Sequence, residues 1–172
     1  MSGLNTALGA VIRPLRTGDI ETVLLLQAAA YGGIELEQAD AFLHKLEYAP
    51  AGCWVAEDAD GVCAYVFSHP GRWLKPPAIG AVLTTAVQAD CWYLHDLVVA
   101  EHVRGQQLAL RLLGQVQRQA QSAGFARLAL ISLQQAVRYW VACGFTPVEP
   151  TSSLQTKLYE YGVGACYMVQ RL

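Results

Sequence analysis

A histidine inside a predicted strand is the first side chain of the sequence that could carry out acid–base chemistry. The segment Cys91–Val99 (CWYLHDLVV) is typical of a strand and contains His95 at its centre. Because imidazole titrates near neutral pH, His95 could take a proton from an attacking amine, directly or through a water molecule. Strand alternation predicts two faces, with Tyr93, His95, Leu97 and Val99 on one and Leu94, Asp96 and Val98 on the other.

His95 also has a purely structural interpretation, as a histidine that is hydrogen-bonded within the sheet, for example to Asp96. Asp96 could orient a neighbour or pair with a basic substrate, but we favour a structural role at the end of the strand. The two interpretations of His95 predict different pH–rate profiles. A base gives a limb near pH 6–7, and His95→Gln should abolish it.

The loop after this strand has the composition of an anion-binding turn. Arg104 and Gly105 lead into a predicted amphipathic helix. The first amides of such a helix lack intrahelical partners and lie at the positive end of the helix dipole. Such a helix start binds phosphate groups; Arg104 adds a cation and Gly105 permits close approach. A solvated turn is the alternative. Neither a Walker-type loop nor a three-glycine dinucleotide loop is present.

These segments need a scaffold of alternating strands and helices. Apolar spacing predicts four helices: after Thr17–Asp19, over 36–48, over 106–123 and over 134–143. Alternation and turn residues predict strands at 10–16, 52–57, 62–68, 91–99 and 125–133, and two within 145–172. Residues 69–90 are rich in proline and glycine and are predicted to form a long loop. This order predicts an α/β fold (an α+β mixed sheet) with helices on both faces.

The composition limits the class of protein. The chain has 172 residues, of which 53% are hydrophobic, and this suits one domain over 10–172 after a flexible tail at 1–9. A net charge of −2 argues against nucleic-acid binding. The five cysteines form no Cys-x-x-Cys pair, which favours reduced thiols, a cytoplasmic location and no metal site. No apolar run is long enough to cross a membrane.

Two blocks of the sequence resemble the GNAT N-acetyltransferase superfamily. The family pattern is Arg or Gln, two residues, Gly, one residue, then Gly or Ala. The segment Arg104-Gly-Gln-Gln107-Leu-Ala109 is similar to it, with Gln107 in place of the glycine. The segment Ala136–Phe145 resembles the helix that ends in Gly-Phe beside the pantetheine arm. The resemblance extends over about residues 10–172.

The resemblance implies a fold and an activity. The fold would be GNAT-like, with a central mixed, mostly antiparallel sheet of about seven strands. The activity would be direct transfer of an acetyl group from acetyl-CoA to a primary amine of a small molecule or peptide. A catalytically inactive CoA-binding module and a transferase for longer acyl chains are the alternatives. Homodimerisation is compatible with the resemblance, and the acceptor amine stays unidentified.

The resemblance also implies positions for the cofactor. Backbone groups of the strand that contains His95 would pair with the pantetheine arm, and one N–H would polarise the thioester carbonyl. The loop and helix start would hold the pyrophosphate. The implied cofactor-binding residues are Leu97, Val98, Val99, Arg104, Gly105, Gln106, Gln107, Leu108, Ala109, Ser132 and Trp140.

Three side chains are implied in catalysis. His95 and Tyr93 fall on strand positions that carry base histidines in some family members. Family members often have a tyrosine four residues before the helix-ending glycine, where it acts as the general acid that protonates the leaving thiolate. In this sequence that position is Trp140. Tyr139 is its neighbour and Tyr167 is another candidate; alternatively, the thiol of CoA leaves without an acid. Trp140 would then be core or a wall of the cofactor channel.

The resemblance places the acceptor pocket between residues 28–48, 69–90 and 150–167. Acidic and aromatic side chains in these segments suit an amine cation, although aromatic residues are also ordinary core. The candidates are Tyr31, Glu35, Glu37, Tyr48, Trp73, Tyr159, Tyr161 and Tyr167.

Overall fold

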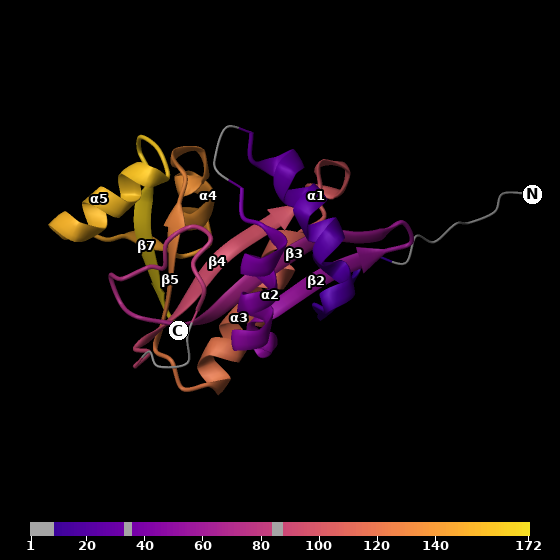
Figure 1. The fold of residues 1–172 in the computed structure, drawn as a ribbon, viewed down its shortest axis with the longest axis horizontal. Helices are drawn as coiled ribbons and strands as arrows, with labels where there is room; N and C mark the ends of the chain where they lie inside the picture. The colour runs from indigo at the N-terminus through magenta and orange to yellow at the C-terminus, as the bar shows by residue number, and fades with distance from the viewer. Residues whose placement is uncertain (1–8, 33–35, 84–87) are drawn as a thin grey trace, which may run out of the picture.

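The computed structural model describes residues 9–32, 36–83 and 88–172, so residues 1–8 of the predicted tail lie outside it. Within these ranges, seven strands form one sheet in the order β1-β2-β3-β4-β5-β7-β6. Neighbouring strands are antiparallel except β4 and β5, which are parallel. The bounds are Val11–Pro14 (β1), Cys53–Asp58 (β2), Gly61–Gly71 (β3), Cys91–Val99 (β4), Arg127–Ser132 (β5), Thr146–Pro147 (β6) and Cys166–Arg171 (β7). The mixed, mostly antiparallel sheet confirms the predicted fold class (Figure 1).

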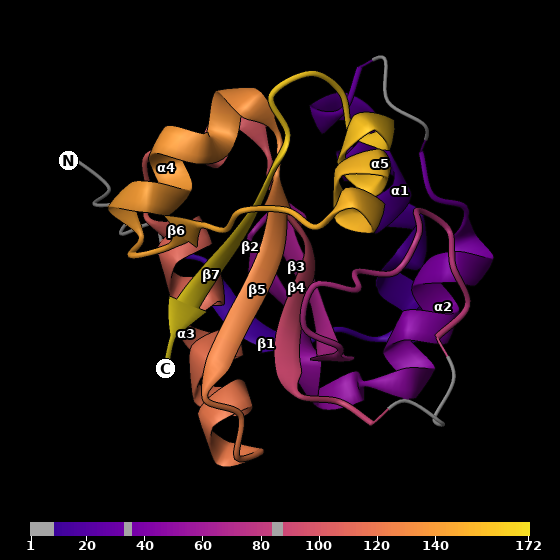
Figure 2. The same ribbon diagram turned by 90° about the vertical axis from the view of Figure 1, so that its left-hand side faces the viewer.

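Helices cover both faces of this sheet (Figure 2). One face packs against α3 and α4, and the opposite face packs against α1, α2 and α5. The bounds are Ile20–Ala30 (α1), Ala39–Tyr48 (α2), Leu108–Ser122 (α3), Val137–Ala142 (α4) and Ser152–Glu160 (α5). Among the described residues, no helix is long and apolar enough to span a membrane.

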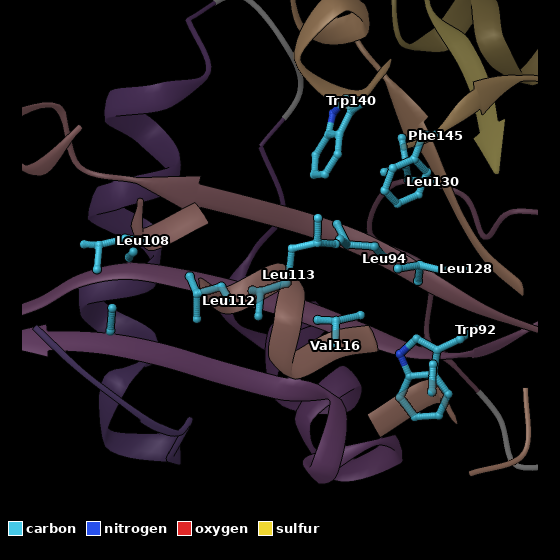
Figure 3. Close-up of a cluster of buried hydrophobic side chains, with 14 of the residues drawn as sticks. Trp92, Leu94, Leu108, Leu112, Leu113, Val116, Leu128, Leu130, Trp140 and Phe145 are labelled. Atoms are coloured by element: carbon cyan, nitrogen blue, oxygen red, sulfur yellow. The ribbon is translucent and has the colours of Figure 1, made fainter. Parts of the chain in front are cut away.

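Helix α3 packs on the sheet through a single apolar stripe. The buried residues of the helix repeat at intervals of three and four, as predicted: Leu108, Leu112, Leu113, Val116 and Ala120. They contact side chains of β4 and β5, which Figure 3 shows together with Trp140 and Phe145. This packing fixes where α3 begins, and therefore where the preceding loop presents its amides.

Helix α5 was not predicted, because the sequence indicated only strands for residues 145–172. The helix begins after Thr151, whose side-chain oxygen accepts a hydrogen bond from the amide of Leu154 at 3.3 Å. Its buried stripe contains only Leu154 and Leu158, and two residues one turn apart are too few to reveal a helical period. The helix packs against Tyr93 of β4 and so closes one side of the sheet near His95.

Strand β4 departs from regular geometry at two places. Its register with β3 shifts between Phe67, which pairs with Asp96, and Ser68, which pairs with Leu94, so His95 is an extra, bulged residue. Its parallel pairing with β5 is limited to Trp92 and Tyr93, so beyond Tyr93 the two strands separate. No described segment pairs with the β5-facing edge of β4 beyond Tyr93, so this edge could bind a ligand.

The bulge corrects the predicted alternation of β4. Two successive residues, His95 and Asp96, lie on the face covered by α1 and α2, together with Val98. Leu97 instead packs on the α3 face with Leu94. One inserted residue inverts the alternation of every residue after it, and the sequence carries no period change that reveals it.

A close approach at Gly52 holds β2 against β3. A Cβ atom at Gly52 would lie 2.0 Å from the carbonyl oxygen of Ser68, whose hydroxyl donates to the Gly52 carbonyl at 2.7 Å. We expect Gly52→Ala to lower the free energy of unfolding by about 3 kcal/mol, because backbone has to move. Gly18→Ala, where the new Cβ meets nothing within 4 Å, is the control. Equal urea midpoints for the two variants would contradict this packing.

Candidate active site

A cavity lies where β4 and β5 separate. Its volume is about 90 Å³, and its walls come from α1, β4 and β5, from Glu37 just before α2, from Ile79 in the segment after β3, and from Tyr161 just after α5. The β4 wall contains His95 and Asp96, the two residues that the bulge places on one face. The full lining comprises Gln27, Tyr31, Glu37, Ile79, His95, Asp96, Ile131, Leu133 and Tyr161. Polar groups therefore gather on one side of an otherwise apolar and aromatic space.

Glu37 is the centre of a buried polar network beside this cavity. Its Oε1 accepts hydrogen bonds from Lys45 Nζ at 2.9 Å and from the backbone amide of Gly80 at 2.7 Å. Its backbone is fixed by the side-chain amide of Gln27, which bonds both the N–H and the carbonyl of Glu37. Burial by itself raises the pKa of Glu37, but His95 and Lys45 outweigh it and bring the pKa to about 2. Glu37 is therefore ionised at neutral pH.

The contact with Glu37 determines which nitrogen of His95 is protonated. His95 Nε2 lies 3.1 Å from both carboxylate oxygens, so this nitrogen carries a proton and donates it. Nδ1 makes no hydrogen bond with any described residue, and the side chain is only 6% exposed. In the neutral imidazole, Nδ1 is thus the basic nitrogen. A carboxylate that orients a histidine in this way also stabilises the imidazolium that forms on protonation.

Asp96 is held by two phenols. Tyr31 and Tyr65 each donate a hydroxyl to a different oxygen of Asp96, both at 2.6 Å. Burial raises the pKa of Asp96, while the two tyrosine hydroxyls oppose that shift. Among the described residues, no cation lies within ion-pair distance of this carboxylate.

A second histidine lies next to His95 on the other strand. His69 belongs to β3, which continues to Gly71 although the sequence predicted a loop from residue 69. Its ring centroid is 5.9 Å from that of His95, and its Nδ1 donates to the carbonyl of Pro70 at 2.8 Å. Burial, assisted by the neighbouring His95, lowers the pKa of His69 to about 3, so this ring stays neutral.

The neutral His69 predicts acid sensitivity of the fold. Its pKa is about 3 when folded, against about 6.5 in an unfolded chain, so the unfolded state binds more protons between these values. Stability should therefore fall as the pH falls below 6.5, by about 2 kcal/mol between pH 7 and pH 5 from this residue. The measurement is urea unfolding at both pH values for wild type and His69→Gln, with exposed His44→Gln as control. If the His69 variant loses as much stability as wild type over this range, the prediction is wrong.

A second hollow, of about 320 Å³, lies at the start of α3. The first hydrogen bond at this end is donated by the amide of Arg111 to the carbonyl of Gln107, so the amides before it have no helical partner. Gly105 has φ +84° and Gln107 has φ +59°, both left-handed. The predicted loop residues that line the hollow are Arg104, Gly105, Gln107, Leu108 and Ala109, joined by Val99, Val103, Leu110 and Tyr139.

Gln107 therefore keeps the backbone conformation that a glycine at this position would favour. A non-glycine residue in the left-handed region costs about 1 kcal/mol, which the anchored start of α3 sustains. Gln107 thus adopts, without being a glycine, the left-handed conformation that leads into α3. Gln106 lies in the same turn and is exposed.

The other predicted cofactor and catalytic residues are not among those that line the two hollows. Trp140 is 8% exposed and packs on Phe145 in the core below α3. Val98 is buried towards α1 and α2, and Leu97 packs on the α3 face. Ser132 is buried at the end of β5 and donates to the carbonyl of Leu133 at 2.9 Å. Tyr93 is buried beside the rings of His69 and His95.

The tyrosines proposed as acid candidates differ in position. Tyr139 is 40% exposed and lines the hollow at the start of α3. Tyr167 is fully buried, and its hydroxyl accepts a hydrogen bond from the amide of Leu74 at 3.2 Å. Burial raises the pKa of both, so each keeps its proton at neutral pH. Only Tyr139 of this pair borders a hollow.

Some of the residues predicted for the acceptor pocket line the cavity, and the others lie elsewhere. Tyr31, Glu37 and Tyr161 line the cavity with His95. Tyr48 borders a separate hollow with His69, and Trp73 packs on Tyr167 and Arg127 away from the cavity. Tyr159 is exposed, and Glu35 lies outside the described residues. The roles of Gln27, Lys45 and Tyr65 were missed by the sequence analysis, because nothing in their spacing connects them with His95 or Asp96.

The chain belongs to the Acetyltransferase (GNAT) family, whose model matches residues 21–145. That match runs from the second residue of α1 to Phe145, and it includes the lining of both hollows except Tyr161. No curated protein sequence is similar enough to the chain to count as a relative.

Solved structures share the fold at low sequence identity. The chain is similar to a chain of the NatC complex bound to Gag peptide and CoA, at 15% identity, with a TM-score of 0.73 and coverage of 96% of this chain and 99% of that one. It is similar to Ard1 from Thermoplasma volcanium, at 14% identity, with a TM-score of 0.72 and the same coverages. It is also similar to the GphF GNAT-like decarboxylase in complex with isobutyryl-CoA, at 13% identity, with a TM-score of 0.74 and coverage of 94% and 98%. At such identities the likeness establishes the fold.

Proposed function

We propose that this protein transfers an acetyl group from acetyl-CoA directly to a primary amine. The observation that carries the proposal is that one strand, β4, borders both hollows. Its bulge places His95 at the cavity, and its end, Val99, lines the hollow formed by the Arg104–Ala109 loop. A thioester bound along the free edge of β4 would lie between an anion-binding turn and a base.

The loop is suited to the pyrophosphate of CoA. The unpartnered amides at the start of α3 and the helix dipole favour an anion, and Arg104 supplies an exposed guanidinium beside them. The left-handed residues Gly105 and Gln107 turn the chain into α3, and the amides of the first turn of that helix have no intrahelical partner. Val99 and Tyr139 extend the hollow towards β4 and would contact the pantetheine arm.

In the proposed reaction, the amine nitrogen attacks the thioester carbonyl carbon. A C–N bond forms, the C–S bond breaks, and a free amide N–H of β4 stabilises the oxyanion. Of the two protons that an ammonium acceptor loses, one passes to His95 Nδ1 and then to solvent, and the other ends on the thiolate of CoA. The thiolate can leave without a donor from the enzyme and take this proton from solvent, because a thiol of pKa about 8.5 is a tolerable leaving group.

Direct transfer is favoured over a covalent enzyme intermediate. Burial raises the pKa of all five thiols, among them Cys143 in the segment that follows α4, so none is a ready thiolate. Among the described residues, His95 is the histidine of the cavity, and it is engaged with Glu37 rather than with a cysteine or serine. The base therefore faces a bound acceptor.

The function is tested by incubating the protein with acetyl-CoA and a panel of primary amines, with thiol release and acetylated product both measured. The proposal predicts that both appear in equal amounts with at least one amine. Binding of CoA without turnover on any amine would instead support a non-catalytic CoA-binding module. Faster turnover with a longer acyl-CoA would mean that the transferred group is that acyl group and not acetyl.

A further inference from the structure

The cavity has a charge imbalance that the proposed transferase chemistry does not by itself explain. Glu37 is balanced by Lys45, which lies 2.9 Å away and is 1% exposed. Asp96 has no such partner among the described residues, although it lines the same cavity. Both oxygens of Asp96 accept a tyrosine hydroxyl, and these hydrogen bonds favour the ionised carboxylate against the opposing effect of burial. An ionised Asp96 has no cation beside it among the described residues, so it offers the cavity a negative charge that a ligand can neutralise.

The base lies directly beside this charge. His95 precedes Asp96 in the bulge, and both side chains line the cavity. His95 is nine-tenths buried, and its Nδ1 makes no hydrogen bond within the described part of the chain. An unpaired anion and an unpaired proton acceptor on the same wall together match one ligand, a group that is both cationic and able to give up a proton. A primary ammonium ion has both properties.

The rest of the lining restricts the body of that ligand. Ile79, Ile131 and Leu133 are aliphatic, and Tyr161 adds an aromatic surface that suits a cation. A cavity of about 90 Å³ would enclose an amino group with a short apolar body.

We propose that the acceptor is a small primary amine with a compact apolar body, which enters the cavity as an ammonium ion and is recognised by Asp96. The proposal rests on the transferase function proposed above and adds the acceptor class and its recognition residue. Tyr31 and Tyr65 fix Asp96 in position, and the adjacent His95 removes the proton once the ammonium is bound. Asp96 therefore acts on binding of the acceptor, whereas His95 acts on the chemical step.

The test compares wild type with Asp96→Asn, using n-butylamine as acceptor. We expect the KM for n-butylamine to rise by about 30-fold or more, because the cation loses its buried partner. The Kd of CoA should stay within about twofold, because Asp96 does not line the hollow at α3. Asp60→Asn, in the exposed turn between β2 and β3, is the matched control and should change neither quantity.

A wild-type measurement makes the inference testable even if Asp96→Asn does not fold. With the CoA complex, n-butylamine should bind at least about 30-fold more tightly than n-butanol, its neutral analogue, and should be acetylated faster than the peptide Ala-Ala-Ala. An unchanged KM in Asp96→Asn, equal binding of amine and alcohol, or preference for the peptide would overturn the inference. In each of these outcomes CoA binding and acetyl transfer persist, whereas their loss in wild type would contradict the proposed function itself.

Discussion

Replacing His95 by glutamine is expected to lower kcat by two to four orders of magnitude, about the contribution of a positioned general base. Glutamine can still hydrogen-bond to Glu37, but it cannot take a proton at the position of Nδ1. The Kd of CoA should be unchanged, because His95 lies at the cavity and not at the loop that precedes α3. Single-turnover kinetics with saturating acetyl-CoA measures this effect separately from acceptor binding.

A matched histidine substitution shows whether the loss is specific to His95. His102→Gln is the control, because His102 is exposed and lies outside both hollows. A kcat for His95→Gln within a factor of about three of wild type would mean that another group takes the proton.

Replacing Glu37 by glutamine is expected to lower the free energy of unfolding by about 3 to 5 kcal/mol. The substitution removes the buried counter-charge of Lys45 and leaves its ammonium with neutral partners only, such as the carbonyl of Ala41 at 3.4 Å. The pKa of Glu37 adds a pH dependence. It is about 2 when folded, below the ordinary value, so the stabilisation is present above pH 4.5 and is lost as the pH falls towards 2. Urea unfolding at pH 7 measures the loss.

A double variant separates the two roles of Glu37. Glu37→Gln combined with Lys45→Met removes both buried charges and should recover most of the lost stability. It should not recover kcat, because a neutral amide stabilises the imidazolium of His95 less than a carboxylate does. Full recovery of both stability and rate would show that Glu37 only balances Lys45. Failure to recover stability would contradict the charge argument.

The sequence predicts the parts of the fold that depend on regular periods. The helix over 106–123 was predicted because the five residues that α3 buries form an apolar stripe long enough to distinguish a helix from a strand. Pro14, which lacks an amide to donate, is compatible with an edge or a strand end, and the structure shows both: it ends β1, which lies at the edge of the sheet. Helix α5 was missed because only Leu154 and Leu158 mark its buried face. Its capping residue Thr151 was the available signal, and the prediction of two strands overlooked it.

The candidate site was less predictable, because it depends on contacts between distant segments. His95 was identified from its residue type and its place in a strand. Its partner Glu37 lies 58 positions earlier and was named only as a candidate of the acceptor pocket, because nothing in the sequence connects it with His95. The burial of Lys45, which only the structure reveals, indicates the network, because a lysine that is 1% exposed requires a buried anion.

The bulge at His95 sets a physical limit on such predictions. Regular alternation put His95 and Asp96 on opposite faces, whereas the structure places both at the cavity. A bulge depends on the register between β3 and β4, and that register is determined by both strands together with their packed faces. The resulting pair of a base and a carboxylate is the feature on which the proposed acceptor recognition depends.

The central claim is that the loop before α3 holds CoA so that its thioester reaches β4. Calorimetric titration of the purified protein with CoA tests this claim most directly, with Arg104→Glu measured in parallel. We expect saturable one-site binding of CoA to wild type, with an affinity about tenfold or more lower in the charge-reversed variant. Absence of binding heat with wild type at several temperatures, or equal affinity of the two proteins, would contradict it.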